Sequence, residues 1–88
     1  MTNIAFTRIV SINKNSLEFN FRKLPGDNMN FHADVTDAKG NRIQFSMYRD
    51  AHTKWHATGN HLPLWIANSE GTIGNNIEME LEALSTAR

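Results

Sequence analysis

Apolar and polar residues alternate along three successive stretches in the first two-thirds of the chain. The stretches are residues 16–22, 28–36 and 42–48, and in each the odd positions are apolar while the even positions are polar or, at 48, a tyrosine. Alternation over seven or more residues is typical of a β-strand with one buried face. The connections LPGDN (24–28) and DAKGN (37–41) are short and hold turn residues. The pattern therefore predicts an antiparallel meander.

Two further stretches extend this sheet. Residues 52–58 (HTKWHAT) predict another strand with Trp55 on its apolar side. The polar side of that strand presents His52, Lys54 and His56. The N-terminal stretch 3–12 also alternates, although Arg8 interrupts its apolar side. Whether 3–12 joins the sheet is left open, so the prediction is a sheet of four to five strands.

The end of the chain has apolar residues at helical spacing. From Pro63 onward, Ile and Leu recur at intervals of seven, four, four and three residues, which places them on one side of a helix over about 63–84. The segment EGTIGNN (70–76) opposes a helix by about 3 kcal/mol, but burying four Ile or Leu side chains contributes roughly 1.5–3 kcal/mol each. The alternative is a short helix at 63–70 followed by a strand. We favour the helix, with a kink near Gly71–Gly74.

These elements define the fold class as α+β. We expect an antiparallel meander sheet of four to five strands with one C-terminal helix (about 63–84) packed on its apolar face, in a single domain over residues 1–88. A chain of this length buries about 60–65% of its unfolded surface, which allows one modest core. The predicted core consists of Leu17, Phe19, Phe21, Met29, Phe31, Val35, Ile43, Phe45, Met47, Trp55, Ile66, Ile73, Ile77, Leu81 and Leu84.

Composition narrows the classes of function. Nine basic and nine acidic residues cancel, so the chain has no overall field that attracts nucleic acid or an anionic membrane, and neutrality favours self-association. The chain has no cysteine, which excludes disulfides and zinc–thiolate sites. Its N-terminal residues lack the apolar stretch of a signal peptide, and no window approaches the roughly 18 apolar residues of a membrane span. We expect a cytoplasmic protein without membrane contact.

Three histidines are the candidate metal ligands. His52, His56 and His61 lie close in sequence, but two histidines four apart on a strand are about 13 Å apart. One ion needs converging ligands, so these residues form a site only if His61 folds back toward the others. The chain also lacks a His-Glu-x-x-His motif. We therefore expect no metal and no cofactor.

Signals of catalysis are absent from the sequence. No serine lies in a Gly-x-Ser-x-Gly turn, and no glycine-rich segment matches a phosphate-binding loop. A catalytic carboxylate needs a cleft that shifts its pKa, and a sheet covered by one helix offers little concavity. We expect that the protein is not an enzyme.

Two groups of residues are candidates for binding. Leu62, Leu64 and Trp65 form a small apolar patch at the start of the predicted helix, and such a patch is more typical of a domain seam or a homodimer contact than of a ligand pocket. A polar partner would meet the other group, on the polar side of the sheet: Arg42, Tyr48, Lys54 and His56. The sequence thus favours a small, non-catalytic interaction or assembly module, expected to be a homodimer, with an unidentified protein partner also open.

The alternative function is binding of single-stranded nucleic acid by the polar face of the sheet. Several strands followed by a C-terminal helix resemble the arrangement of PUR-type and Whirly-type single-strand binders, although a shared arrangement does not imply a shared function. Such proteins stack bases on aromatic rings. Here the rings lie on the core side, and Tyr48 stands alone on the polar side.

Overall fold

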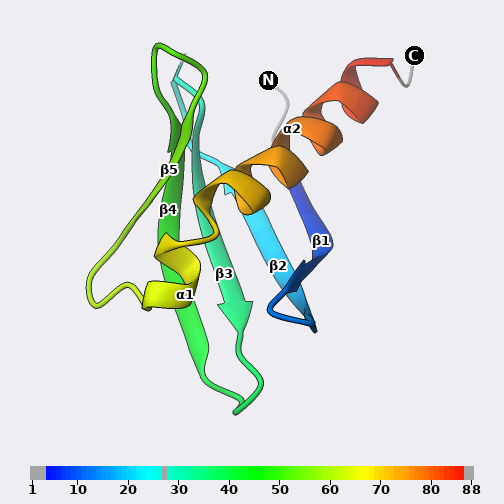
Figure 1. The fold of residues 1–88 in the computed structure, drawn as a ribbon. Coiled ribbons are helices and arrows are strands. Elements are labelled where there is room, and N and C mark those ends of the chain that lie inside the picture. Colours follow the sequence, from blue (N-terminus) through cyan, green and yellow to red (C-terminus); the bar gives the residue numbers. More distant parts are fainter. Residues whose placement is uncertain (1–3, 27, 87–88) are drawn as a thin grey trace.

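A computed structural model describes residues 4–26 and 28–86 of the chain as a five-stranded sheet with two helices (Figure 1). The elements are β1 (Ala5–Ile12), β2 (Asn15–Lys23), β3 (Asn30–Thr36), β4 (Arg42–Arg49), β5 (Trp55–Thr58), α1 (Leu64–Ala67) and α2 (Glu70–Thr86). The strands are antiparallel and lie in the order β1-β2-β3-β4-β5, so each strand pairs with its neighbour in sequence. The predicted α+β meander is confirmed, and the N-terminal stretch is one of its strands.

Short turns between the strands account for the meander. Asn13 and Lys14 connect β1 to β2 in a two-residue turn, and both have positive φ, 52° and 67°. The backbone twist of such a turn matches the right-handed twist of the strands it joins. Between β3 and β4, the carboxylate of Asp37 accepts the N–H of Asn41 at 2.8 Å and Gly40 has φ 88°. Of the predicted 24–28 turn, residue 27 lies outside the described residues.

One face of the sheet and one side of α2 form the core. The helix crosses the sheet from β5 to β1 on the face that carries the odd-numbered residues of β2–β5 and the even-numbered residues of β1 (Figure 1). Phe19, Phe31 and Met47 on the sheet and Ile73 and Ile77 on α2 are fully buried. The predicted division into odd and even sides is confirmed. Leu17, Met29, Ile43 and Leu81 are partly buried and pack against this core.

Arg8, which interrupts the apolar side of β1, is held by α2. Its Nε donates to Asn76 Oδ1 at 3.0 Å, and its Nη1 lies 2.9 Å from Glu80 Oε1. The guanidinium thus has partners at the edge of the core, where an unpaired charge would be costly. The interruption in the pattern marks the point where β1 contacts α2.

The predicted kink near Gly71–Gly74 is wrong, although the prediction of helix over 76–84 is confirmed. α2 runs without interruption through both glycines, and the break lies before it, at Asn68 and Ser69. There the hydroxyl of Ser69 donates to the C=O of Trp65 at 2.7 Å, and its N–H donates to the C=O of Ile66 at 2.9 Å. Ser and Asn side chains compete with helical hydrogen bonds and so favour such breaks.

Gly74 is buried where α2 contacts the sheet. A Cβ at this position would overlap the Cβ, Cγ and Cδ1 atoms of Trp55. The glycine therefore permits the close approach of α2 to β5. The low helix propensity of glycine does not by itself indicate this packing role.

Two other expectations need correction. Leu84 is not a core residue: it is 48% exposed, because the last turns of α2 extend past β1 (Figure 1). The predicted strand 52–58 is shorter and begins at Trp55. Its first residues form a turn in which Thr53 has φ 64° and the carboxylate of Asp50 accepts the N–H groups of His52 and Lys54.

Candidate interaction surfaces

The other face of the sheet, which carries the even-numbered residues of β2–β5 and the odd-numbered residues of β1, is open, because the helices of the described chain lie on the core face (Figure 1). A ladder of hydrogen bonds crosses it from Thr7 through Asn20 to Asp34, which also binds Arg42 at 3.1 Å. Burial tends to raise the pKa of Asp34, but hydrogen bonds from Asn20 and Arg42 outweigh it and hold the pKa below its usual value. These groups largely satisfy one another, so this part of the face has little to offer a ligand.

At the other end of the open face, Tyr48 and His56 form a pair of stacked rings. They are cross-strand partners on β4 and β5, with ring centroids 5.0 Å apart and an angle of 28° between the rings. His56 Nε2 lies 2.8 Å from Asp50 Oδ2. The hydrogen bond from His56, followed by the N–H groups of Lys54 and His52, lowers the pKa of Asp50 to about 2.

The structure brings together only part of the predicted polar site. Tyr48 and His56 are in contact, and Lys54 is exposed in the turn before β5. Arg42 lies at the other end of β4, about 20 Å from Tyr48 along the strand. The stacking of the two rings could not be predicted from the sequence, because it depends on the register between β4 and β5. Alternation of apolar and polar residues does not specify that register.

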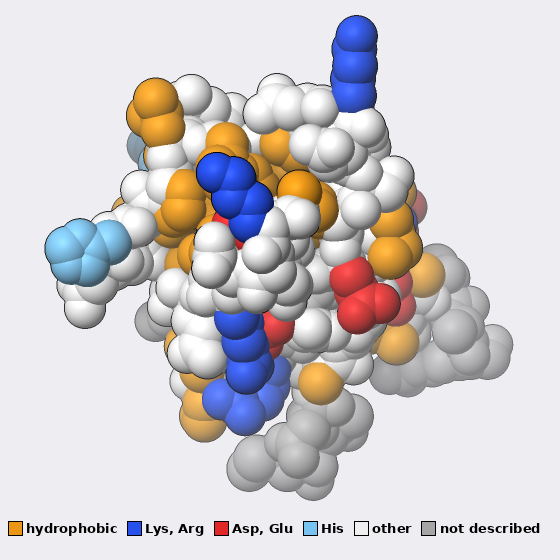
Figure 2. Space-filling model, turned by 90° about the horizontal axis from the view of Figure 1, so that it is seen from below, with side chains coloured by type: hydrophobic (Ala, Val, Ile, Leu, Met, Phe, Trp, Pro, Cys, Tyr) orange, Lys and Arg blue, Asp and Glu red, His pale blue; other side chains and the backbone are white. Residues whose placement is uncertain are grey.

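The predicted apolar patch lies at the end of the sheet with the β1–β2 and β3–β4 turns (Figure 1). Leu62 packs against the core, Leu64 is 74% exposed, and Trp65 is half-buried. Seen from this end, hydrophobic side chains show at the surface, with a Lys or Arg side chain reaching over them (Figure 2).

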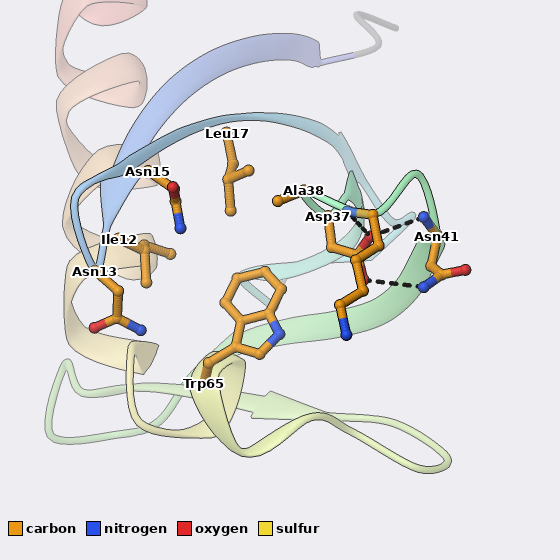
Figure 3. Close-up of a pocket in the computed structure, with 9 residues that line it drawn as sticks. Ile12, Asn13, Asn15, Leu17, Asp37, Ala38, Asn41 and Trp65 are labelled. Atoms are coloured by element: carbon orange, nitrogen blue, oxygen red, sulfur yellow. Dashed lines mark hydrogen bonds between the residues drawn. The ribbon is translucent and has the colours of Figure 1, made fainter.

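Trp65 forms one wall of a groove of about 420 Å³. Its ring stands between the two turns, opposite Leu17 and Ile12, with the amide of Asn15 at the upper rim (Figure 3). The full lining is Ile12, Asn13, Asn15, Leu17, Asp37, Ala38, Lys39, Asn41 and Trp65. Because three separate segments build the groove, sequence spacing could identify Trp65 but not the residues around it.

A second hollow, of about 390 Å³, is lined in part by Glu70 and Glu78. Both carboxylates have structural partners. Glu78 Oε2 accepts from Arg49 at 2.6 Å and from Trp55 Nε1 at 3.1 Å, and Glu70 Oε2 accepts the N–H of Ala57 at 2.8 Å. These hydrogen bonds hold α2 on the sheet. Both carboxylates are thus engaged in structural contacts rather than directed at the hollow.

The three candidate metal ligands do not converge. His56 pairs with Asp50, while His52 and His61 are exposed, each in a turn. Among residues 4–26 and 28–86, no three His, Asp or Glu side chains lie close enough together to hold a metal ion. In the same residues, no helix is both long and apolar enough to cross a membrane. The expected cytoplasmic location stays a prediction.

Comparison with known proteins identifies no relative: neither a family model, nor a curated protein, nor a solved structure matches the chain. The function is therefore argued from the surfaces described above.

Proposed function

We propose that the protein is a non-catalytic interaction and assembly module that works as a homodimer. The observation that carries the proposal is the apolar stripe of α2. Ile73 and Ile77 are fully buried on this stripe, Leu81 is partly buried, and Leu84 is 48% exposed. The stripe thus continues beyond the sheet that covers it, as expected for a helix whose last turns are covered by a second copy.

The composition and the surfaces support the same proposal. A neutral chain has little net repulsion between copies, and a small domain gains stability from association. The acids that line the second hollow serve structural roles, which argues against catalysis there. The groove at Trp65, with Leu64 exposed beside it, offers a further contact for a protein partner.

Sedimentation velocity over a range of concentrations tests the dimer. We expect the wild type to sediment as a dimer and Leu84→Glu to shift it toward monomer. Met79→Glu is the matched control, because Met79 is similarly exposed (45%) but lies on the opposite side of α2 from Ile77. A wild type that remains monomeric at high concentration would refute the proposal.

A second candidate function, binding of single-stranded nucleic acid, is supported by the Tyr48–His56 pair on the open face. Stacked rings that are partly exposed offer a platform for bases, and each stacked base contributes about 1–3 kcal/mol. Against this, the acids Glu18 and Asp34 lie on the same face.

Fluorescence anisotropy with a labelled oligo-dT tests this second candidate. If it is correct, the affinity falls steeply between about 50 and 200 mM salt, and Tyr48→Ala weakens binding by roughly tenfold. Gln44→Ala serves as the control, because Gln44 is exposed on the same face of β4, about 13 Å along the strand from Tyr48. Absence of binding at low salt removes the candidate.

A further inference from the structure

The two edges of the sheet differ in how they are protected. β5 is only four residues long, and the carboxylate of Glu70 occupies the outward N–H of Ala57 at 2.8 Å. Short edge strands with charged covers are how proteins prevent pairing with further strands. The β5 edge is therefore closed to another strand.

The other edge, β1, has none of these protections. It is eight residues long, and its pairing with β2 continues from Ala5↔Arg22 to Ile12↔Asn15 without a bulge. It contains no proline, and its single charged residue, Arg8, faces α2. No other strand of the described chain lies beside it.

The register shows which groups on β1 are available. The N–H of Lys23 donates to the C=O of Ile4 at 2.9 Å, so Ile4 and every second residue after it turn their main-chain groups toward β2. The main-chain groups of the alternate residues point away from β2. These residues are Ala5, Thr7, Ile9 and Ser11, and all four are exposed.

We propose that β1 pairs antiparallel with β1 of a second copy, so that two sheets join into one continuous sheet. This inference rests on the proposed homodimer and names its interface. Main-chain pairing along an open edge is a common mode of association, and a two-fold axis makes the same edge meet itself.

Side chains select the register of this pairing. With Ile9 opposite Ile9 of the second copy, the side chain that is 61% exposed on each β1 meets its equivalent on the open face. Arg8 then lies opposite Val10 of the other copy. The neighbouring register would place the two Arg8 residues opposite each other, which like charges disfavour.

The overhang of α2 fits the same arrangement. The helix extends past β1 on the buried face of the sheet (Figure 1). In the proposed pairing, a second sheet joined at β1 continues the surface beneath this end of the helix. Leu84 of each copy then gains cover from the other. One interface thus accounts for both the open edge and the exposed end of the apolar stripe.

Cysteine cross-linking tests the register, because the natural chain has no cysteine. In a hydrogen-bonded antiparallel pair, directly opposite Cα atoms are about 5.5 Å apart, within the range of a disulfide. Ile9→Cys should therefore form a covalent dimer under mild oxidation at least tenfold faster than Thr7→Cys. Thr7 is the matched control, on the same strand and face but about 13 Å from its equivalent in the proposed register.

Ile9→Lys supplies a second measurement by placing two like charges opposite each other. We expect at least a tenfold increase in the dimer dissociation constant, while circular dichroism shows an unchanged fold. If the wild type is a dimer but Ile9→Lys leaves the constant unchanged and both cysteine variants cross-link equally slowly, the β1 interface is wrong and the homodimer stands. If the wild type is a monomer, both the proposed homodimer and the proposed β1 interface are wrong.

Discussion

Replacing Gly74 by alanine tests how closely α2 approaches the sheet. Alanine improves helix propensity by about 0.8–1.0 kcal/mol in a helix interior. The added methyl group, however, would overlap three atoms of Trp55, which is buried at 8% exposure. Because one of these atoms is the Cβ, rotation of the side chain does not relieve the overlap. Overpacking of a core typically costs 1–3 kcal/mol, and the upper end applies here.

The expected net loss for Gly74→Ala is therefore about 2 kcal/mol, which lowers Tm by roughly 8–16 °C in a domain of this size. Gly71→Ala is the control in the same helix. A Cβ at Gly71 meets nothing within 4 Å, so the same substitution should stabilise by about 0.4–1 kcal/mol. Thermal unfolding followed by circular dichroism measures both.

Opposite signs for the two glycines are the essential outcome. If Gly74→Ala is as stable as Gly71→Ala, α2 does not lie against Trp55 as described, and the packing argument for Gly74 is wrong. Chemical unfolding at 25 °C provides an independent value, since Tm and stability at room temperature need not change in proportion.

Three further outcomes follow from the contacts of the chain. The pKa of Asp50 is lowered from 3.8 to about 2, so its stabilising effect is present above about pH 4 and lost as the pH falls toward 2. Stability measured by urea unfolding should therefore fall less over this range in Asp50→Asn than in the wild type, and an equal fall in both would contradict the bond to His56. Arg8 and Glu80 should show a coupling of about 0.5–1 kcal/mol in a double-mutant cycle, because both are largely shielded from water, and a value of zero would contradict the pairing. Lys14→Gly should stabilise the protein by about 0.5–1 kcal/mol in thermal unfolding, because Lys14 has φ 67°, a left-handed conformation that glycine adopts without strain. A loss of stability would show that residue 14 does not adopt this conformation.

Local pattern was sufficient to predict the sheet. Which side of a strand is buried depends only on alternation, so Phe19, Phe31, Phe45 and Trp55 were assigned to the correct face from their positions alone. Pattern also marked Arg8 as an exception. Its partner Glu80 lies 72 residues away, and periodicity carries no information about such a pair.

The errors arose where tertiary contacts decide. Spacing shows which side of α2 is apolar, but not where the sheet beneath it ends, so Leu84 was assigned to the core. Glycine propensity suggested a kink at Gly74, yet the close contact with Trp55 explains this glycine, and Ser69 marks the break. The groove at Trp65 and the Tyr48–His56 pair both combine segments that only the folded chain brings together.

The order of elements along the chain has a consequence for synthesis. Each hairpin of the meander closes from residues made in succession, so the sheet can form while α2 is still inside the ribosome. The 17 residues of α2 emerge after the sheet, and until then the phenylalanines on the core face of the sheet are exposed to water. A chain interrupted before α2 would expose that hydrophobic surface to chaperones and proteases, and packing of α2 on the sheet is what buries it.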